Sequence, residues 1–558
     1  MMTQIETVNL KDLSSIRTVS KVVAFLFTLF AFLIPLNANA EALVSLQSYL
    51  SKDTISNVKI HDSDLIHEFY TARADKPLWL SGNRMSKDVQ PILQLFANSW
   101  EHGLNPNNYA IGVLGEALKA RRLDDPFYYE VLMSAAVVDY ARDLSAMRVP
   151  PREINQLSKF WQPAPDARAV LEFVSKAKNP APALESYAPQ SKIYKRFQQE
   201  LKMLIEQIEK GDPRESVLPI SVPHTLHVGD RSAVVQDIRY RLGAELKDNG
   251  ADPAVYDDEL ARAVMAYQAR NGLKQDGVIG PRTVDVLNIS LKDKLKKVLV
   301  NMERARWVQR DMPAKYVVVN IPAQTVWAID DGKIAIEMPV IIGSKKRETN
   351  SFVTKVTGVR FNPTWTVPET IKFQDYLPML MKDPNALNNK GIEFYWGHGK
   401  DSLSLPPSSI QWEFLSKDDI KAIRMVQGPG ATNPLGRIRL HMPNQYNIYL
   451  HDTSTHGRFQ NGDRALSSGC VRMERPEEMA MFILNPNKNW SADRMKSILD
   501  AGKMVDVWAH ETTPIFLLYQ TIWLDDQENL IYGYDVYSKD RELYNVMRKY
   551  DMLPFGKI

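Results

Sequence analysis

The sequence is poor in the features that identify several large protein classes. It has one cysteine, Cys470, in 558 residues, which excludes an intramolecular disulfide. It contains no cysteine pair, H-E-x-x-H, G-x-x-x-x-G-K-[ST] or G-x-S-x-G motif, so nothing indicates the corresponding zinc, phosphate-loop or serine-hydrolase chemistry. The net charge is only +3, too small to indicate nucleic-acid binding.

The composition and length indicate a globular chain of several domains. Hydrophobic residues make up 44% and charged residues 24% of the sequence, which is the balance of a folded protein. At roughly 150 residues per domain, the length favours three or four domains.

An apolar run at residues 22–34 lies near the N-terminus. Basic residues precede it and an A-x-A motif follows it: Lys11, Arg17 and Lys21, then Ala38-Asn39-Ala40. These are the parts of a secretory signal peptide over residues 1–40, cleaved after Ala40. The run is shorter than the about 20 residues that span a bilayer, although the long basic region leaves an uncleaved anchor open. We expect export, and no membrane contact beyond this segment.

The first half of the chain is predicted to be mainly helical. Apolar residues recur at helical spacing within residues 41–220, and we expect helices at 63–72, 92–100, 128–147 and 191–210. Residues 225–290 combine short apolar stripes with tight turns, which predicts a three-helix module. Residues 291–312 are predicted to be a helical linker.

The second half changes to strands. Residues 313–512 begin with two β segments joined at Asp330-Asp331-Gly332, a hairpin signature. An insertion at residues 371–430 is long enough to be a lid or binding loop. Its Trp396 and neighbouring aromatic residues are expected either to shape a groove or to form the insertion's own core. Residues 513–558 add a hairpin around Asp525-Asp526. The predicted fold class is multidomain α+β with a mostly antiparallel β domain.

The candidate site lies between Tyr446 and Met473. Residues 446–451 alternate apolar and polar side chains, which predicts a strand that ends at His451. Nineteen positions later, a turn of small residues delivers Cys470. A catalytic thiol needs a base to generate the thiolate, and His451 is the candidate. The turn leaves the backbone N–H groups of Gly469 and Cys470 available for an oxyanion.

The same residues also allow other interpretations. A lone cysteine is most often a small buried hydrophobic residue. The polar flanks of Cys470 and the export signal instead favour a thiol that takes part in catalysis. His456 is a second candidate base, and we prefer His451 because it ends an apolar strand. His441 could join these two histidines in a zinc site, but no acidic partner has ligand spacing. We therefore expect no metal and no cofactor.

The motif resembles that of a known family. His451 followed by Ser468-Gly469-Cys470-Val471-Arg472 resembles the active site of the L,D-transpeptidases of the YkuD type. The sequence around His451 resembles the large Gram-negative YcbB-like branch, although Asp452 replaces the glycine of many members. Residues 69–80 resemble the scaffold domain of that branch, and residues 226–287 resemble a peptidoglycan-binding domain, which either binds or is purely structural. The insertion and the last 46 residues resemble its capping subdomain and C-terminal extension.

The resemblance implies a cysteine acyltransferase of the periplasm. Cys470 would form a thioester with a peptidoglycan stem tetrapeptide, D-alanine would leave, and a second stem peptide would resolve the thioester into a 3→3 cross-link. His451 would be the general base and acid, oriented by a backbone carbonyl near Asp452. Carbapenems would acylate Cys470. An L,D-carboxypeptidase and a non-catalytic wall-binding scaffold stay open as alternatives.

Further residues are predicted to support this chemistry. Ser468 and Gly469 would support the oxyanion, and Arg472 would either hold a substrate carboxylate or brace the loop. The predicted substrate-binding residues are Tyr449, Asp452, Trp365 and Asn433.

Overall fold

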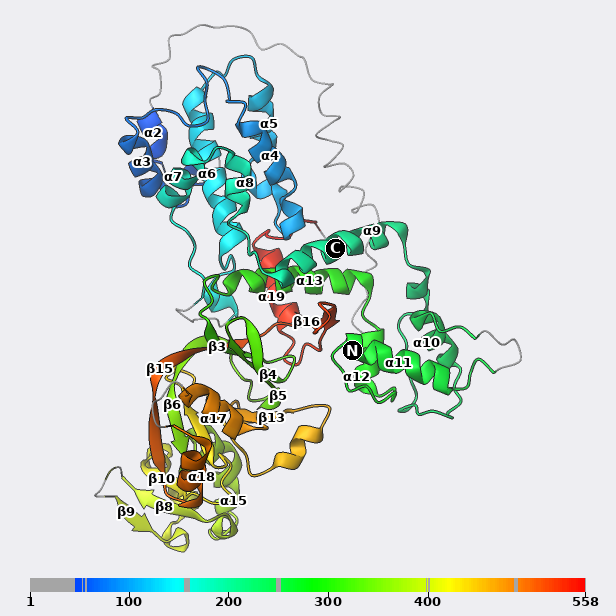
Figure 1. The fold of residues 1–558 in the computed structure, drawn as a ribbon, viewed down its shortest axis with the longest axis vertical. Helices are drawn as coiled ribbons and strands as arrows, with labels where there is room; N and C mark the ends of the chain where they lie inside the picture. The colour runs from blue at the N-terminus through cyan, green and yellow to red at the C-terminus, as the bar shows by residue number, and fades with distance from the viewer. Residues whose placement is uncertain are drawn as a thin grey trace.

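The computed structural model describes residues 46–52, 54–55, 58–154, 161–246, 252–397, 399, 402–485 and 490–556. The predicted signal peptide at residues 1–40 lies outside the described residues. Among the helices that are described, none is both long and apolar enough to cross a bilayer. The chain forms a helical body, a three-helix lobe at its side, a β domain below the body, and a small subdomain at the far end of the β domain (Figure 1).

The helical body confirms the helices predicted from periodicity. Its helices are α2 (Leu46–Leu50), α3 (Ser63–Ala72), α4 (Val89–Ala97), α5 (Ile111–Lys119), α6 (Pro126–Ser145), α7 (Ala167–Lys176), α8 (Pro180–Glu185) and α9 (Lys192–Lys210). Helix α6 begins where Pro126 occupies the first turn and Asp125 accepts a hydrogen bond from the Tyr128 N–H, a favourable N-terminal cap. It is buried on most sides, so it is the core helix of the body.

Helix α13 (Leu291–Trp307), predicted as a linker, also joins the core of the body. It contacts α9, α6, α19 (Lys539–Lys549) and β16 (Ile522–Leu524). Its buried Glu303 carboxylate is paired with Arg148 at 2.7 Å and with Arg306 at 3.1 Å. Since a buried charge needs such partners, this helix is fixed in place. One hydrophobic cluster runs through the helical body, α13 and the C-terminal extension.

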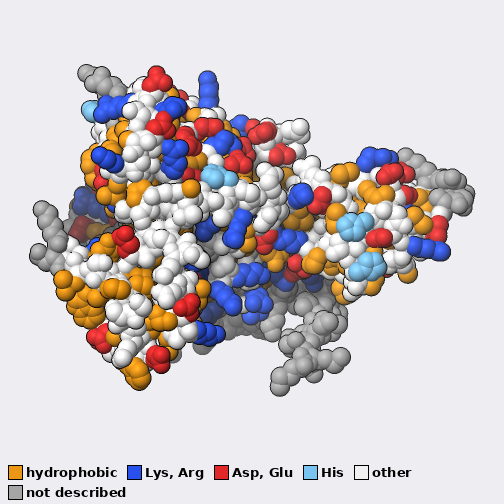
Figure 2. Space-filling model, turned by 90° about the horizontal axis from the view of Figure 1, so that it is seen from below, with side chains coloured by type: hydrophobic (Ala, Val, Ile, Leu, Met, Phe, Trp, Pro, Cys, Tyr) orange, Lys and Arg blue, Asp and Glu red, His pale blue; other side chains and the backbone are white. Residues whose placement is uncertain are grey.

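The lobe is the predicted three-helix module. It contains α10 (Val234–Leu242), α11 (Asp258–Arg270) and α12 (Pro281–Leu287) around a small core of its own. Gly272 lies against the ring of Trp523, where an added Cβ would approach to 2.9 Å. Arg282 forms an ion pair with Asp463 of the β domain. Seen from below, Lys and Arg side chains gather between the lobe and the rest of the molecule (Figure 2).

The β domain is a mostly antiparallel nine-stranded sheet in the order β13-β5-β14-β12-β11-β6-β15-β3-β4. The strands are β3 (Lys315–Asn320), β4 (Thr325–Asp330), β5 (Lys333–Gly343), β6 (Phe352–Phe361), β11 (Ile438–His441), β12 (Leu450–His451), β13 (Ala465–Ser467), β14 (Val471–Met473) and β15 (Val505–Leu518). Strands β4 and β5 also pair, which closes the order on itself. Helix α17 (Pro476–Leu484) packs on β6, β15 and β11, and α18 (Ala492–Asp500) follows it.

A second sheet forms the capping subdomain, here defined as residues 365–427. Its strands are β7 (Trp365–Thr366), β8 (Ile392–Trp396), β9 (Leu403–Leu405) and β10 (Ile423–Gln427), in the order β7-β10-β8-β9. Trp365, Phe394 and Trp412 are buried in a core separate from that of the β domain, whereas Trp396 is 41% exposed. The subdomain therefore begins before residue 371, and Trp396 stands outside its core.

Candidate active site

Cys470 lies in a tight turn between β13 and β14. We call Ser467–Cys470 the cysteine turn. The Ser467 hydroxyl accepts a hydrogen bond from the Gly469 N–H at 3.1 Å and donates to the Cys470 carbonyl at 2.6 Å. Gly469 has φ +113°, a conformation that favours glycine.

The turn corrects the predicted pair of oxyanion donors. The Gly469 N–H is already engaged by Ser467. The Cys470 N–H has no acceptor within the described part of the chain. One of the two predicted amides is therefore free to stabilise an oxyanion.

The strand that carries His451 is shorter than predicted. Only Leu450–His451 is extended. Upstream, the Asn444 side chain accepts hydrogen bonds from the N–H groups of Tyr446 and Ile448, and Asn447 has φ +54°. This local side-chain bonding competes with strand pairing. The prediction that residues 446–449 belong to the strand was wrong, whereas His451 does end it.

The sheet register places His451 beside the strand that follows Cys470, whose thiol lies 3.8 Å from the Asn447 carbonyl oxygen. Strands β12 and β14 run parallel, with Leu450 beside Val471 and His451 beside Arg472. The Val471 N–H donates to the Tyr449 carbonyl at 3.0 Å. Cys470 lies just before β14 and two positions before Arg472, which pairs with His451. Because side chains alternate along a strand, this spacing places Cys470 diagonally from His451.

His451 is buried and held in one orientation. Its Nδ1 donates to the carbonyl of Asp452, which confirms the predicted backbone partner and leaves Nε2 as the proton acceptor. Burial, with smaller contributions from Arg472 and Arg439, lowers the pKa of His451 to about 3. The imidazole is therefore neutral near pH 7.

Two arginines flank His451 in one row across the sheet. Arg439 on β11 pairs with His451, and His451 pairs with Arg472. Neither guanidinium forms an ion pair with a carboxylate among the described residues, and the Nε atoms of both are buried without a partner. Burial raises the pKa of the Cys470 thiol, and Arg472 and Arg439 oppose this rise. The site thus holds a neutral thiol and a neutral imidazole beside uncompensated positive charge.

Arg439 was not among the residues predicted from the sequence. Its guanidinium lies over the ring of Tyr449, 4.7 Å from the centroid, and its placement beside His451 depends on strand register. The next pair in the row, Arg360 and Asp506, is neutralised by a 2.6 Å ion pair. A basic residue on the strand before His451 was the only feature of the sequence that could have indicated Arg439. The sequence alone does not give the pairing register that brings the two residues side by side.

The structure places the other predicted residues as follows. The Asp452 carboxylate is buried and accepts hydrogen bonds from the N–H groups of Arg437 and Thr453, so it fixes the backbone around His451. An added Cβ at Gly436 would collide with it. Arg472 donates weakly to the Thr455 hydroxyl at 3.4 Å. Both Asp452 and Arg472 are next to the site.

Two predicted residues lie where the capping subdomain joins the sheet. The buried Asn433 amide donates to the carbonyls of Pro363 and Gly428 at 2.9 Å each. Trp365 is buried in the capping core, edge-on to Tyr376 at 6.3 Å. Both side chains pack where the capping subdomain meets the sheet. Their predicted contact with substrate stays a prediction.

The three histidines considered for zinc have different partners. His441 Nε2 lies 2.8 Å from an Asp506 oxygen, and His456 Nε2 lies 3.2 Å from an Asp452 oxygen. No group of three or more His, Cys, Asp or Glu side chains suited to a metal occurs in the described ranges.

The site combines a half-buried thiol, a buried neutral histidine and, among the described residues, a Cys470 N–H without an acceptor. Family models match three regions in order, described as "Scaffold domain" (residues 64–201), "Putative peptidoglycan binding domain" (231–287) and "L,D-transpeptidase catalytic domain" (314–507). Residues 314–507 thus match the model of the L,D-transpeptidase catalytic domain, and the domain order is that expected from the sequence.

A curated relative and solved structures carry the same family name. A "Putative L,D-transpeptidase" of Haemophilus influenzae is 31% identical over 240 residues, which is 42% of this chain and 47% of the relative. The match thus spans about half the length of that protein. An L,D-transpeptidase structure from Mycobacterium smegmatis is 14% identical with TM-score 0.18, covering 37% of this chain and 58% of that one. One from Stackebrandtia nassauensis is 15% identical with TM-score 0.19, covering 53% and 97%.

Proposed function

We propose that this protein is an L,D-transpeptidase that forms 3→3 cross-links in peptidoglycan through a thioester on Cys470. The observation that carries the proposal is the parallel pairing of β12 and β14, which sets His451 beside the strand that directly follows Cys470, inside the region matched by the catalytic family model. The donor is a stem tetrapeptide, and the acceptor is a second stem peptide.

Acylation starts from the neutral pair. As the sulfur attacks the carbonyl carbon of the third stem residue, His451 Nε2 takes the thiol proton. The oxyanion accepts a hydrogen bond from the Cys470 N–H. The imidazolium then gives its proton to the amine of the terminal D-alanine while the C–N bond breaks. D-alanine leaves, and the third residue remains bound to sulfur as a thioester.

The second half reverses these proton transfers. The side-chain amine of the acceptor's third residue attacks the thioester carbon, and His451 accepts a proton from that amine. The C–S bond breaks, the new amide forms, and the proton returns to the Cys470 sulfur. No cofactor takes part in this scheme.

The uncompensated arginines suit an anionic peptide substrate. Arg439 and Arg472 favour the thiolate as it develops and offer donors to a stem-peptide carboxylate. The three-helix lobe supplies a second place for peptidoglycan contact. The apolar run at residues 22–34 supports export to the periplasm.

Product analysis tests the proposal. The protein without residues 1–40 is incubated with a disaccharide tetrapeptide, and released D-alanine and muropeptides are quantified beside Cys470→Ala. We expect D-alanine and 3→3 dimers from the wild-type protein only. Tripeptide without dimers would replace the proposal by an L,D-carboxypeptidase, in which water resolves the same thioester. If neither D-alanine nor a new muropeptide is formed, the remaining alternative is the non-catalytic wall-binding scaffold.

A further inference from the structure

A single loop, residues 344–349, contacts every residue of the cysteine turn that precedes Cys470. We call it the cradle loop. The Ser344 N–H donates to the Ser467 carbonyl at 2.9 Å, and Arg347 donates to the Ser468 hydroxyl at 3.0 Å. The Thr349 hydroxyl donates to the Gly469 carbonyl at 2.7 Å. The shape of the turn is therefore set by the cradle loop together with the hydrogen bonds of Ser467 within the turn.

The Thr349 contact falls on the peptide unit that matters for catalysis. The Gly469 carbonyl and the Cys470 N–H belong to one planar peptide, so a bond that fixes the carbonyl also fixes the direction of the N–H. That N–H is the amide left free for the oxyanion. A donor aimed before the reaction starts needs no reorganisation in the transition state.

Thr349 is itself held from two sides. Its hydroxyl accepts a hydrogen bond from the Gly343 N–H at 2.9 Å, which leaves its single proton for Gly469. Its backbone N–H donates to the Tyr537 hydroxyl at 3.2 Å. An added Cβ at Gly343 would lie 2.7 Å from the Thr349 nitrogen, so the loop closes tightly at this point. Thr349 is 3% exposed.

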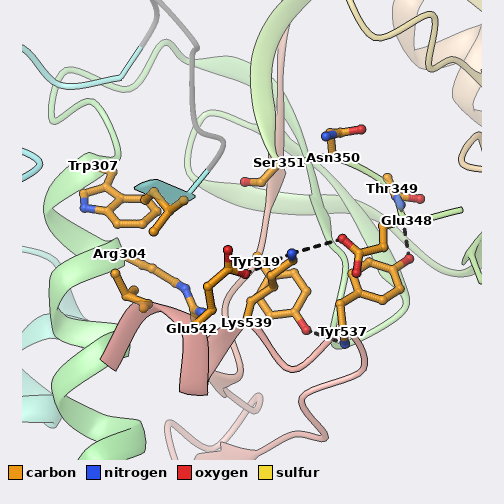
Figure 3. Close-up of a pocket in the computed structure, with 12 residues that line it drawn as sticks. Arg304, Trp307, Glu348, Thr349, Asn350, Ser351, Tyr519, Tyr537, Lys539 and Glu542 are labelled. Carbon is orange, nitrogen blue, oxygen red and sulfur yellow. Dashed lines mark hydrogen bonds and ion pairs between the residues drawn. The ribbon is translucent and has the colours of Figure 1, made fainter. Parts of the chain in front are cut away.

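Tyr537 comes from the C-terminal extension. Its hydroxyl donates to the Gly343 carbonyl, and its N–H donates to the Tyr519 hydroxyl at 2.8 Å. Tyr519 in turn donates to Asp535 at 2.6 Å. Figure 3 shows Tyr537 joined to Thr349 and to Tyr519. These residues line a cavity of about 60 Å³. A second link, the Lys539–Glu348 ion pair at 3.2 Å, ties the same extension to the loop.

We infer that Thr349 is a positioning residue for the oxyanion-binding amide of Cys470, and that Tyr537 makes the C-terminal extension part of this support. The inference rests on the proposed acyl transfer. It assigns a catalytic consequence to a segment of the fold that packs on the helical body and carries neither His451 nor Cys470.

The test compares two reactions of the same sulfur. Acylation by a tetrapeptide donor passes through an oxyanion, whereas alkylation by iodoacetamide does not. In Thr349→Val the hydroxyl is lost at nearly constant volume. We expect acylation to slow by at least about tenfold, toward the 10²–10³ typical of a lost oxyanion donor, with alkylation changed less than about twofold. Thr349→Ser keeps the donor and is expected to restore acylation.

The C-terminal link is tested with a matched pair. Tyr537→Phe should slow acylation selectively and by less than Thr349→Val, while Tyr544→Phe, at a buried tyrosine of the same extension, should not. Equal slowing of acylation and alkylation would show general disorder of the turn and overturn the inference, as would unchanged acylation in Thr349→Val. If the wild-type protein is not acylated but is alkylated, the proposed function has failed instead.

Discussion

The cysteine turn and the capping subdomain are built in opposite ways. The turn has almost no core of its own and is fixed by hydrogen bonds from the cradle loop to Ser467, Ser468 and Gly469. The capping subdomain has its own sheet and its own hydrophobic core. Arg347 is the residue that joins the two: it binds Ser468 at 3.0 Å and Asp375 at 2.6 Å.

This difference separates the residues that carry out the reaction from those that control how the donor peptide enters the site. Groups that react must be held closely, because a small displacement weakens both proton transfer and oxyanion binding. A body with its own core can shift as a unit while its interior stays packed. Changes around His451 should therefore affect the chemical step, whereas changes at the Arg347 join should affect how the donor peptide is admitted.

The largest effect is expected from His451→Asn. Loss of the base should slow acylation by about 10²–10⁴, because the neutral thiol then has no acceptor for its proton. Rapid-quench measurement of acylation gives the rate, and a melting curve checks the fold. The matched control is His456→Asn, five positions away with its side chain 56% exposed, which should stay within about twofold of wild type by the same measurement. A larger loss in the control would make His456 the base.

The same histidine predicts how stability depends on pH. The pKa of His451 is lowered to about 3 in the fold, from about 6.5 in the unfolded chain. Between these values the unfolded chain binds more protons, so stability decreases as the pH falls, by up to about 1.4 kcal/mol per pH unit for this group. Denaturant unfolding of wild type and His451→Asn between pH 7 and 4 should show a smaller loss in the variant. Parallel curves would contradict the buried, neutral imidazole.

Removal of Arg439 should have an intermediate effect. Arg439→Met keeps the bulk over Tyr449 but removes a positive charge that lowers the pKa of the Cys470 thiol. The thiol pKa, read from the pH dependence of iodoacetamide alkylation, should rise, and kcat/KM should fall by roughly tenfold, about 1.4 kcal/mol. Arg437→Gln, on an exposed side chain two positions earlier, is the control. An unchanged thiol pKa would remove Arg439 from the site.

The smallest effect is expected at the join. Asp375→Asn weakens the ion pair with Arg347, in which the Asp375 side chain is 42% exposed. Pairs of this exposure contribute about 0.2–1 kcal/mol, so KM should rise by at most about fivefold with kcat nearly constant. Asp418→Asn, at a side chain 92% exposed elsewhere in the capping subdomain, should change neither constant. A fall in kcat alone would mean that the join supports the chemical step.

Local signals predicted much of this fold. The helix predicted at residues 63–72 matches α3, since its apolar residues recur at helical spacing. The hairpin at Asp331-Gly332 and the three-helix module also follow from local sequence. The pairing of Cys470 with His451 in catalysis was inferred from their spacing and motif and stays a prediction.

The remaining features depend on contacts between distant parts of the chain. Helix α13 is a core helix because Arg148, 155 positions before Glu303, pairs with it. Arg439 stands beside His451 through strand register, and Thr349 reaches Gly469 across 120 positions. The strand predicted at residues 446–449 was lost to the side chain of one asparagine, Asn444. Hydrophobic periodicity concerns residues that are close in the sequence, so it does not predict these contacts.

The most direct measurement is the intact mass of the protein after brief incubation with a disaccharide tetrapeptide, followed by peptide mapping of the modified species. A mass increase equal to the donor minus D-alanine, located on the peptide that contains Cys470 and absent from Cys470→Ala, is the predicted result. An adduct on any other residue, or D-alanine release without a cysteine adduct in either rapid or slow sampling, would contradict a thioester at Cys470.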